Sequence, residues 1–290
     1  MAYTIEARGL RKAFGDTRVL DGLDLQVQRG EVFALLGPNG AGKTTTVRIL
    51  STLLAPDHGT ARVAGHDVVR EAKAVRSAIS LTAQEAAVDG LLTGAENLRM
   101  MARLRRVKDK RRVDALLEQF DLTDAANRRV ETYSGGMRRR LDLAMSLIAH
   151  PQVIFLDEPT TGLDPRSRNA VWDAVKALAD GGTTILLTTQ YLEEADRLAD
   201  RIAVLAQGQI AALGTADELK ARIGRETVEL FFDDEETANA ATAVLGGLKL
   251  PVDGAEDVRR ILDDLADRGL PATRIALHKP TLDEVFLALT

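Results

Sequence analysis

Short apolar stretches with the spacing of β-strands open the chain. Residues 3–36 contain "YTIEARGL", "RVLDGLDLQVQ" and "EVFALL", separated by glycines and charged turns. Runs of this kind, bounded by turn residues, predict a strand-rich start. From about residue 94 to 150 the apolar positions recur three and four apart, in "ENLRMMARL", "VDALLEQF" and "RRRLDLAMSLI". This spacing predicts a mainly helical segment without strands.

Strand-like runs return after the helical segment, as "VIFLD" (153–157), "TTILLTT" (183–189) and "RIAVLAQGQI" (201–210). Segments with helical spacing lie between them, and this alternation predicts a parallel sheet covered by helices. Past about residue 219 shorter helical and strand-like stretches mix, from "ETVELFF" to "TLDEVFLALT". We therefore expect a first domain over residues 1–218, with a helical subdomain at about 85–150, and a small α+β domain over residues 219–290.

Composition then narrows the classes of function. The 290 residues carry 38 Lys and Arg against 43 Asp and Glu, a net charge of −5 that attracts neither nucleic acid nor an anionic membrane. The basic run "RLRRVKDKRR" (103–112) lacks interleaved aromatic residues, so we interpret it as a solvated helix face. With no cysteine and four histidines without ligand spacing, no thiolate or histidine metal site is expected. We also expect no signal peptide, no membrane span in the chain and no nucleic-acid partner.

A phosphate-binding loop follows the strand-like run "EVFALL". The segment "GPNGAGKTT" satisfies the pattern G-x-x-x-x-G-K-[ST] between a strand and a helix. Glycines let backbone N–H groups turn toward phosphate oxygens, and the start of the helix favours anions. This context disfavours the alternative of a glycine-rich turn without a ligand. We predict that the nucleotide contacts Gly37, Pro38, Asn39, Gly40, Ala41, Gly42, Lys43, Thr44 and Thr45.

A pair of carboxylates follows the buried run "VIFL". Asp157 stands at the carboxyl end of this predicted strand and Glu158 comes next. We predict that Asp157 and the Thr44 hydroxyl hold Mg²⁺, that Lys43 neutralises phosphate charge, and that Glu158 deprotonates the attacking water. An isolated Asp-Glu pair is usually a solvated strand end, but the phosphate loop favours the catalytic interpretation.

The ordered motifs of residues 1 to about 215 resemble the ATP-binding-cassette (ABC) ATPases. "YSGGMRRRLDLAMSLI" (133–148) is similar to the family signature, "TGLDP" (161–165) to the D-loop, and "LTAQEAAVDGLLTGAENL" to the Q-loop. The resemblance implies an α/β P-loop NTPase domain with a mixed sheet, an antiparallel β subdomain and a helical subdomain, followed by the small α+β domain. It implies ATP and Mg²⁺ as ligands. Gln84 would reach Mg²⁺, and Phe14 would stack on adenine, with plain core as the alternative for this ring.

The resemblance also implies a second copy of the chain. Ser134, Gly135 and Gly136 would contact the γ-phosphate of a nucleotide held by the opposite subunit, and Asp164 would lie at the dimer seam. A hydroxyl and glycine N–H groups at a helix start form a good anion site, and this chain already has one complete phosphate loop. A head-to-tail homodimer that closes on two ATP satisfies both half-sites.

Three positions depart from the usual family pattern. Tyr133 and Met137 replace the common Leu and Gln of the signature, which leaves the Ser-Gly-Gly centre intact. Gln190, after the run "TTILLTT", replaces the usual histidine. A glutamine can hydrogen-bond a γ-phosphate but cannot shuttle a proton, which favours a sensing role and leaves Glu158 as the base.

The branch most similar to this chain is the daunorubicin/doxorubicin-resistance type of exporter ATPase, judged by the signature, by "LLTTQYLEEADRLADRIAVLAQG" and by "HKPTLDEVFLALT". The resemblance implies drug efflux through a separate transmembrane permease subunit, at the cytoplasmic face of the membrane. An importer ATPase, a cassette protein acting outside transport, and a nucleotide-binding regulator without turnover are the alternatives. The arginines of "RRR" (138–140) could be surface charge or could support the phosphate site.

Overall fold

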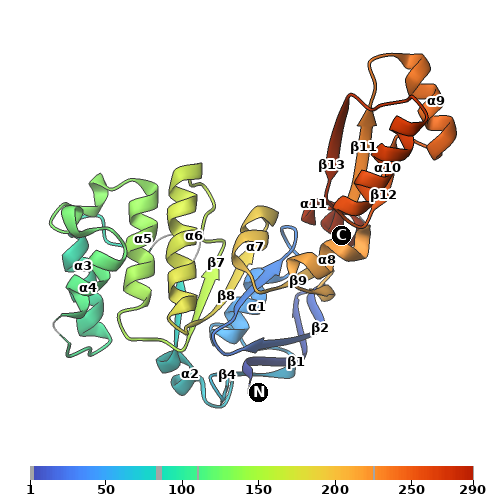
Figure 1. Cartoon of the computed structure of the whole chain (residues 1–290). Helices are drawn as coiled ribbons and strands as arrows, with labels where there is room; N and C mark the ends of the chain where they lie inside the picture. Colours follow the sequence, from blue (N-terminus) through green and yellow to red (C-terminus); the bar gives the residue numbers. More distant parts are fainter. Residues whose placement is uncertain (1–2, 83–86, 110, 225, 290) are drawn as a thin grey trace. The chain divides into compact units, whose positions relative to one another are not determined.

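The structure is a computed structural model that describes residues 3–82, 87–109, 111–224 and 226–289. It divides into two units, residues 3–216 with Leu289 and residues Asp217–Ala288 (Figure 1). Each unit has its own hydrophobic core.

A six-stranded sheet forms the centre of the first unit. Its order is β10-β9-β3-β8-β7-β6, parallel except for β10. The strands are Val32–Leu36 (β3), Ile79–Thr82 (β6), Val153–Asp157 (β7), Thr184–Thr189 (β8), Arg201–Ala206 (β9) and Gln209–Gly214 (β10). Strands β3 and β8 are buried along their whole length, as parallel strands covered on both faces are. The predicted α/β core is confirmed, and the carboxyl ends of β3, β7 and β8 meet at one edge.

A second, antiparallel sheet has the order β2-β1-β4-β5. Its strands are Tyr3–Phe14 (β1), Thr17–Gln28 (β2), His58–Val63 (β4) and His66–Asp67 (β5). Strands β4, β5 and β6 were not predicted from the sequence. In β4 only Ala61 and Val63 are buried, so no apolar run marks the strand, and pairing with β1 defines it.

Helices complete the first unit. They are Lys43–Leu50 (α1), Ala72–Ala78 (α2), Gly94–Leu104 (α3), Arg112–Gln119 (α4), Gly135–Ser146 (α5), Pro165–Asp180 (α6) and Leu192–Leu198 (α7), with 3₁₀ turns at Thr123–Ala125 (η1) and Val130–Thr132 (η2). Helices α3, α4 and α5 gather beside α6 (Figure 1). Among the described residues from 87 to 150, the only β-pairing is a bridge between Thr93 and Arg129, so the strand-free prediction for this segment is confirmed.

The second unit contains a three-stranded antiparallel sheet of order β12-β11-β13. Its elements are Glu226–Phe231 (β11), Glu235–Leu245 (α9), Lys249–Val252 (β12), Ala255–Asp267 (α10) and Arg274–His278 (β13), and Ala216–Ile223 (α8) and Leu282–Leu289 (α11) stand at its two ends in the sequence. Val228, Leu230 and Val252 from the sheet pack with Ala241, Val258 and Leu265 from the helices. An antiparallel sheet packed against helices is the α+β fold that was predicted for the C-terminal segment.

None of the helices that the structure describes combines the length and the apolar character needed to cross a bilayer.

Candidate functional site

The loop between β3 and α1 requires glycine at two positions. A Cβ on Gly37 would lie 2.6 Å from the Leu205 carbonyl oxygen, and one on Gly42 would lie 2.9 Å from the Val19 carbonyl oxygen. Gly42 also has a φ of 107°, in the left-handed region, and it caps α1 without a side chain. A larger residue at either position would therefore displace the loop from the neighbouring strands β9 and β2.

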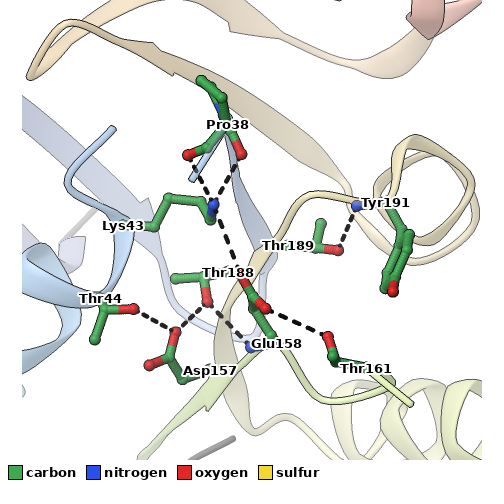
Figure 2. Close-up of polar contacts among 10 residues, drawn as sticks. Pro38, Lys43, Thr44, Asp157, Glu158, Thr161, Thr188, Thr189 and Tyr191 are labelled. Carbon is green, nitrogen blue, oxygen red and sulfur yellow. Dashed lines mark hydrogen bonds and ion pairs between the residues drawn. The ribbon is translucent and has the colours of Figure 1, made fainter. Parts of the chain in front are cut away.

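Lys43 is the first residue of α1, and its ammonium group lies inside the loop. Nζ donates to the carbonyl oxygens of Gly37 (2.8 Å) and Pro38 (3.1 Å) and lies 3.7 Å from Glu158 Oε1 (Figure 2). Burial lowers the pKa of Lys43, while the carboxylates of Glu158 and Asp157 act in the opposite direction. The loop thus holds a desolvated cation at its centre, where it would act strongly on an anionic group.

Three oxygen-bearing side chains meet at the carboxyl end of β7. Thr44 Oγ1 and Thr188 Oγ1 both donate to Asp157 Oδ1, at 3.2 Å and 2.6 Å (Figure 2). Among the described residues, none donates a hydrogen bond to Asp157 Oδ2. Neighbouring strands β7 and β8 bring Asp157 and Thr188 together, because these two residues are register partners.

Glu158 leaves the strand with an unusual backbone. Its φ of 47° lies in the left-handed region, which is uncommon for a residue with a Cβ. Strained backbone conformations of this kind are often found at functional sites. The Glu158 N–H donates to the carbonyl and hydroxyl oxygens of Thr188, at 3.1 Å and 3.2 Å. Thr161 Oγ1 donates to Glu158 Oε2 at 3.3 Å. The carboxylate is thereby held between Lys43 and Thr161 (Figure 2).

Gln190 lies just past β8, two residues after the register partner of Asp157. It is half-buried, and the next N–H, that of Tyr191, donates to Thr189 Oγ1 at 2.9 Å. Within the part of the chain that the structure describes, the Gln190 side chain makes no hydrogen bond. Gln190 therefore lies at the edge of the site, and no hydrogen bond from the described residues fixes the position of its side chain.

The signature residues cap a helix. Ser134 is the N-cap of α5 and accepts from the Met137 N–H at 3.2 Å. Gly136 is packed against Ser167, because a Cβ there would lie 2.5 Å from Ser167 Oγ. Asp164 caps α6 and accepts from the Ser167 hydroxyl (2.6 Å) and N–H (3.0 Å), bonds that lower its pKa. Ser167 thus joins the signature to the D-loop.

The signature and the phosphate loop are not brought together within one chain. No hydrogen bond joins residues 134–136 to residues 37–45 in the described parts of the structure. Tyr133, one departure from the family pattern, is buried and donates to the Ala125 carbonyl at 2.6 Å. This bond anchors the start of α5 to the helical segment and explains a tyrosine in place of leucine.

Two further predicted positions have different outcomes. The alternative that Phe14 is plain core is wrong, because its side chain is 50% exposed and Lys12 Nζ lies 5.7 Å from the ring centroid. Gln84 lies outside the described residues.

The arginines at 138–140 are not simple surface charge. Arg139 is buried and donates to the Pro159 carbonyl at 2.8 Å, whereas Arg140 pairs with Asp121 at 3.1 Å. Arg138 donates to the Val130 and Glu131 carbonyls. Among the hydrogen bonds that these three arginines make with the described residues, only those of Arg139 reach the segment that carries Glu158, through the Pro159 carbonyl.

Sequence reasoning missed a buried cluster below the loop that follows Glu158. Glu194 on α7 is fully buried, and its Oε1 accepts from Thr160 Oγ1 (2.7 Å) and Trp172 Nε1 (3.0 Å). "YLEEAD" looks like the exposed first turn of a polar helix, so no local signal marks Glu194. Thr188 was also missed, although a hydroxyl at the end of a buried strand next to an aspartate strand could have indicated it.

Two family models cover most of the chain. The model described as "ABC transporter" matches residues 20–161, and the model described as "ATP-binding protein DrrA1-3-like, C-terminal domain" matches residues 214–290.

Similar proteins extend over the full chain. "Daunorubicin resistance ATP-binding protein DrrA3" of Streptomyces coeruleorubidus is 54% identical over 100% of this chain and 96% of its own length. "Daunorubicin/doxorubicin resistance ATP-binding protein DrrA" of Streptomyces peucetius is 50% identical over 99% and 92%. "Nod factor export ATP-binding protein I" of Ralstonia nicotianae is 39% identical over 99% and 93%.

Solved structures share the fold of the first unit. An ATP-binding subunit of an ABC transporter has a TM-score of 0.67 and 28% identity over 76% of this chain and 92% of its own. An ATP-binding cassette of an ABC transporter in its ADP conformation has a TM-score of 0.69 and 25% identity over 75% and 93%. The chain therefore belongs to the ATP-binding, ATP-hydrolysing proteins of the ABC transporter family, in the group that carries the DrrA-type C-terminal domain.

Proposed function

We propose that this chain is the ATP-hydrolysing subunit of an ABC exporter that moves drug-like or hydrophobic compounds through a separate membrane subunit. The observation that carries the proposal is the position of Glu158, beside Asp157 and 3.7 Å from Lys43. Its carboxylate stands at the edge of a phosphate loop, where a base for water is needed. The direction of transport is supported by relatives named for drug resistance and for export of Nod factor.

In the proposed reaction, water attacks the γ-phosphorus of ATP in line, and ADP and phosphate are released. The loop from Gly37 to Thr45 binds the phosphates through its N–H groups. Lys43 exchanges its contacts with the loop carbonyls for phosphate oxygens and stabilises the charge of the transition state. Glu158 accepts the proton of the attacking water, and Gln190 orients the γ-phosphate by a hydrogen bond.

The cluster of Thr44, Asp157 and Thr188 fits Mg²⁺. Carboxylate and hydroxyl oxygens are the ligands that this cation prefers, and Thr188 fixes Asp157 through Oδ1. Thr44 and Asp157 would hold the ion, together with Gln84 from outside the described residues. When bound, Mg²⁺ would neutralise charge on the phosphates.

We further propose that the chain works as a homodimer, with residues 1–218 as the cassette, including a helical subdomain at about 85–150, and residues 219–290 as a separate domain. Ser134, Gly135 and Gly136 would complete the partner's nucleotide site, with Asp164 at the seam. The exposed ring of Phe14 would stack on adenine. Closure on ATP and release after hydrolysis would move the permease, and the chain would then act at the cytoplasmic face of the membrane.

Transport itself tests the proposal. Cells that carry this chain together with its membrane subunit are expected to accumulate less daunorubicin than cells that carry the Glu158→Gln variant with the same subunit. Equal accumulation in the two strains would contradict drug export, and ATP-dependent uptake of a solute would favour the importer alternative.

The role of Gln190 can be separated by two substitutions. Gln190→Ala is expected to lower kcat by roughly ten- to a hundredfold, the effect of losing a hydrogen bond to a charged group. Gln190→His is expected to keep turnover, because its ring N–H can replace the amide donor. The measurement is steady-state ATPase activity, with Gln209→Ala, exposed on β10, as the control. Full activity of the alanine variant would mean that Gln190 only ends a strand.

The second unit is expected to serve assembly. Removing residues 217–290 should leave nucleotide binding intact, because the phosphate loop and the Asp157 cluster lie in the first unit with its own core. Pairing with the membrane subunit should weaken. Nucleotide affinity and co-purification with the membrane subunit are the measurements, and unchanged co-purification would remove this role.

A further inference from the structure

A buried ion pair lies on the inner face of the signature helix. Arg139 and Asp142 are 4% and 5% exposed, and Arg139 Nη1 lies 3.2 Å from Asp142 Oδ2. The two residues are one helical turn apart on α5, five and eight residues after Ser134. Burial raises the pKa of Asp142 to about 6, and the Arg139 guanidinium acts in the opposite direction. The geometry is that of an ion pair closed off from solvent.

The pair contacts two different segments of the nucleotide site. Arg139 Nε donates to the carbonyl oxygen of Pro159 at 2.8 Å, the residue directly after Glu158. Asp142 Oδ1 accepts from the N–H of Ala87 at 3.3 Å, in the chain that leaves the segment containing Gln84. One turn of the signature helix is therefore tied to the loop of the base and to the end of the Q-loop.

The loop after Glu158 is also held on a second side. Glu194 accepts from Thr160 Oγ1 at 2.7 Å, and it lies on α7, the helix that begins just after Gln190. Pro159 and Thr160 are thus fixed by charged side chains from two helices, α5 and α7. The left-handed φ of Glu158 makes this support necessary, because a strained backbone persists only where its surroundings determine it.

We propose that Arg139 and Asp142 are positioning residues that couple the signature helix to the backbone of Glu158 and to the Q-loop. A buried ion pair adds little to stability compared with apolar residues of the same volume, because desolvation offsets the attraction. Its directional bonds, in contrast, fix the relative positions of the segments that it joins. When a nucleotide engages the signature, a displacement of α5 is then transmitted to the carbonyl of Pro159, and so to the base. The inference rests on the proposed role of Glu158.

The test replaces the pair by apolar residues of similar size, Arg139→Met together with Asp142→Leu. The melting temperature is expected to stay near that of the wild type, and the affinity for ATP to change by less than about twofold, because the phosphate loop is untouched. The value of kcat is expected to fall by at least about tenfold, since the loop of Glu158 loses its anchor. If the pair only stabilised the fold, the double variant would keep both the melting temperature and the kcat of the wild type.

The matched control is the neighbouring pair of Arg140 and Asp121, which joins the same helix to the chain after α4 with Nη1 and Oδ2 3.1 Å apart. Arg140→Met with Asp121→Asn should leave kcat within about twofold, because this pair does not touch the nucleotide site. Arg139→Leu with Asp142→Met serves as a second apolar variant in case the first double variant does not fold, because it also removes both charges and both directional bonds, and it should likewise lose turnover at unchanged ATP affinity.

A wild-type kcat in either folded variant of the Arg139 and Asp142 pair would overturn the proposal. Glu158→Gln, measured alongside, separates the two hypotheses. An active Glu158→Gln protein would remove the base from the proposed function, whereas an inactive one beside a fully active double variant would remove only the coupling.

Discussion

Replacing Glu158 with glutamine is expected to lower kcat by about a hundred- to ten-thousand-fold, the contribution of a general base, while ATP still binds. Glutamine has the same shape and can keep the contact with Thr161, but it cannot accept a proton. The substitution also removes a negative charge 3.7 Å from the Lys43 ammonium. The loss of this charge reduces the electrostatic repulsion of the bound triphosphate and so favours ATP binding. Because hydrolysis opens the proposed dimer, the variant should accumulate as a dimer with ATP.

Three measurements test these effects. They are the steady-state ATPase activity, the amount of nucleotide that the protein retains, and the oligomeric state of the protein in MgATP. Glu193→Gln makes the same chemical change on α7, at a carboxylate that pairs with Arg168 at 3.5 Å, away from Asp157 and Lys43, and should keep activity. Near-normal hydrolysis by Glu158→Gln would exclude this residue as the base. Loss of ATP binding would instead indicate that the carboxylate supports the phosphate loop.

The local signals in the sequence were sufficient for the parts of the fold that are buried or glycine-dependent. The apolar run of β3 and the apolar centre of β8, bounded by turn residues and followed by helical spacing, indicated buried parallel strands, and Gly37 and Gly42 stand where a Cβ would meet a backbone carbonyl. Strand β4 could not be predicted in the same way. Its sequence "HGTARV" has two buried side chains, and its strand character comes from hydrogen bonds to β1, some 50 residues earlier in the chain.

The buried charged residues that support the site could not be predicted from the sequence either, because their burial depends on contacts with distant parts of the chain. Arg139, Asp142 and Glu194 are charged residues in helices, a pattern that predicts exposure. They are buried because their partners, such as the Pro159 carbonyl and the Thr160 hydroxyl, come from a loop distant in the sequence. The residues of the phosphate loop and of the end of β7 could be predicted, because local sequence motifs identify them. The residues that position them do so through tertiary contacts alone.

Two inactive variants are expected to regain activity when they are mixed. Lys43→Ala removes the cation from the phosphate loop, and Gly135→Asp places a carboxylate at the exposed start of α5, where it would repel a γ-phosphate. Both changes are compatible with the fold, because a Cβ on Gly135 has an ordinary 3.4 Å contact with Leu163 and an acid in the first turn favours the helix. Each homodimer then has two defective sites.

A head-to-tail dimer that contains one copy of each variant has both defects in one site and none in the other. In an equal mixture half of the dimers are mixed, and each has one intact site of two, so the ATPase rate should reach about a quarter of the wild-type rate if the sites act independently. The rate of the mixture is compared with the rates of the separate variants, and cross-linking of differently tagged chains verifies that mixed dimers form. Activity no higher than the separate variants, with mixed dimers present, would mean that the signature serves its own chain. The described contacts argue against that outcome, because the signature hydroxyl caps its own helix and is bonded to Met137 rather than to the phosphate loop.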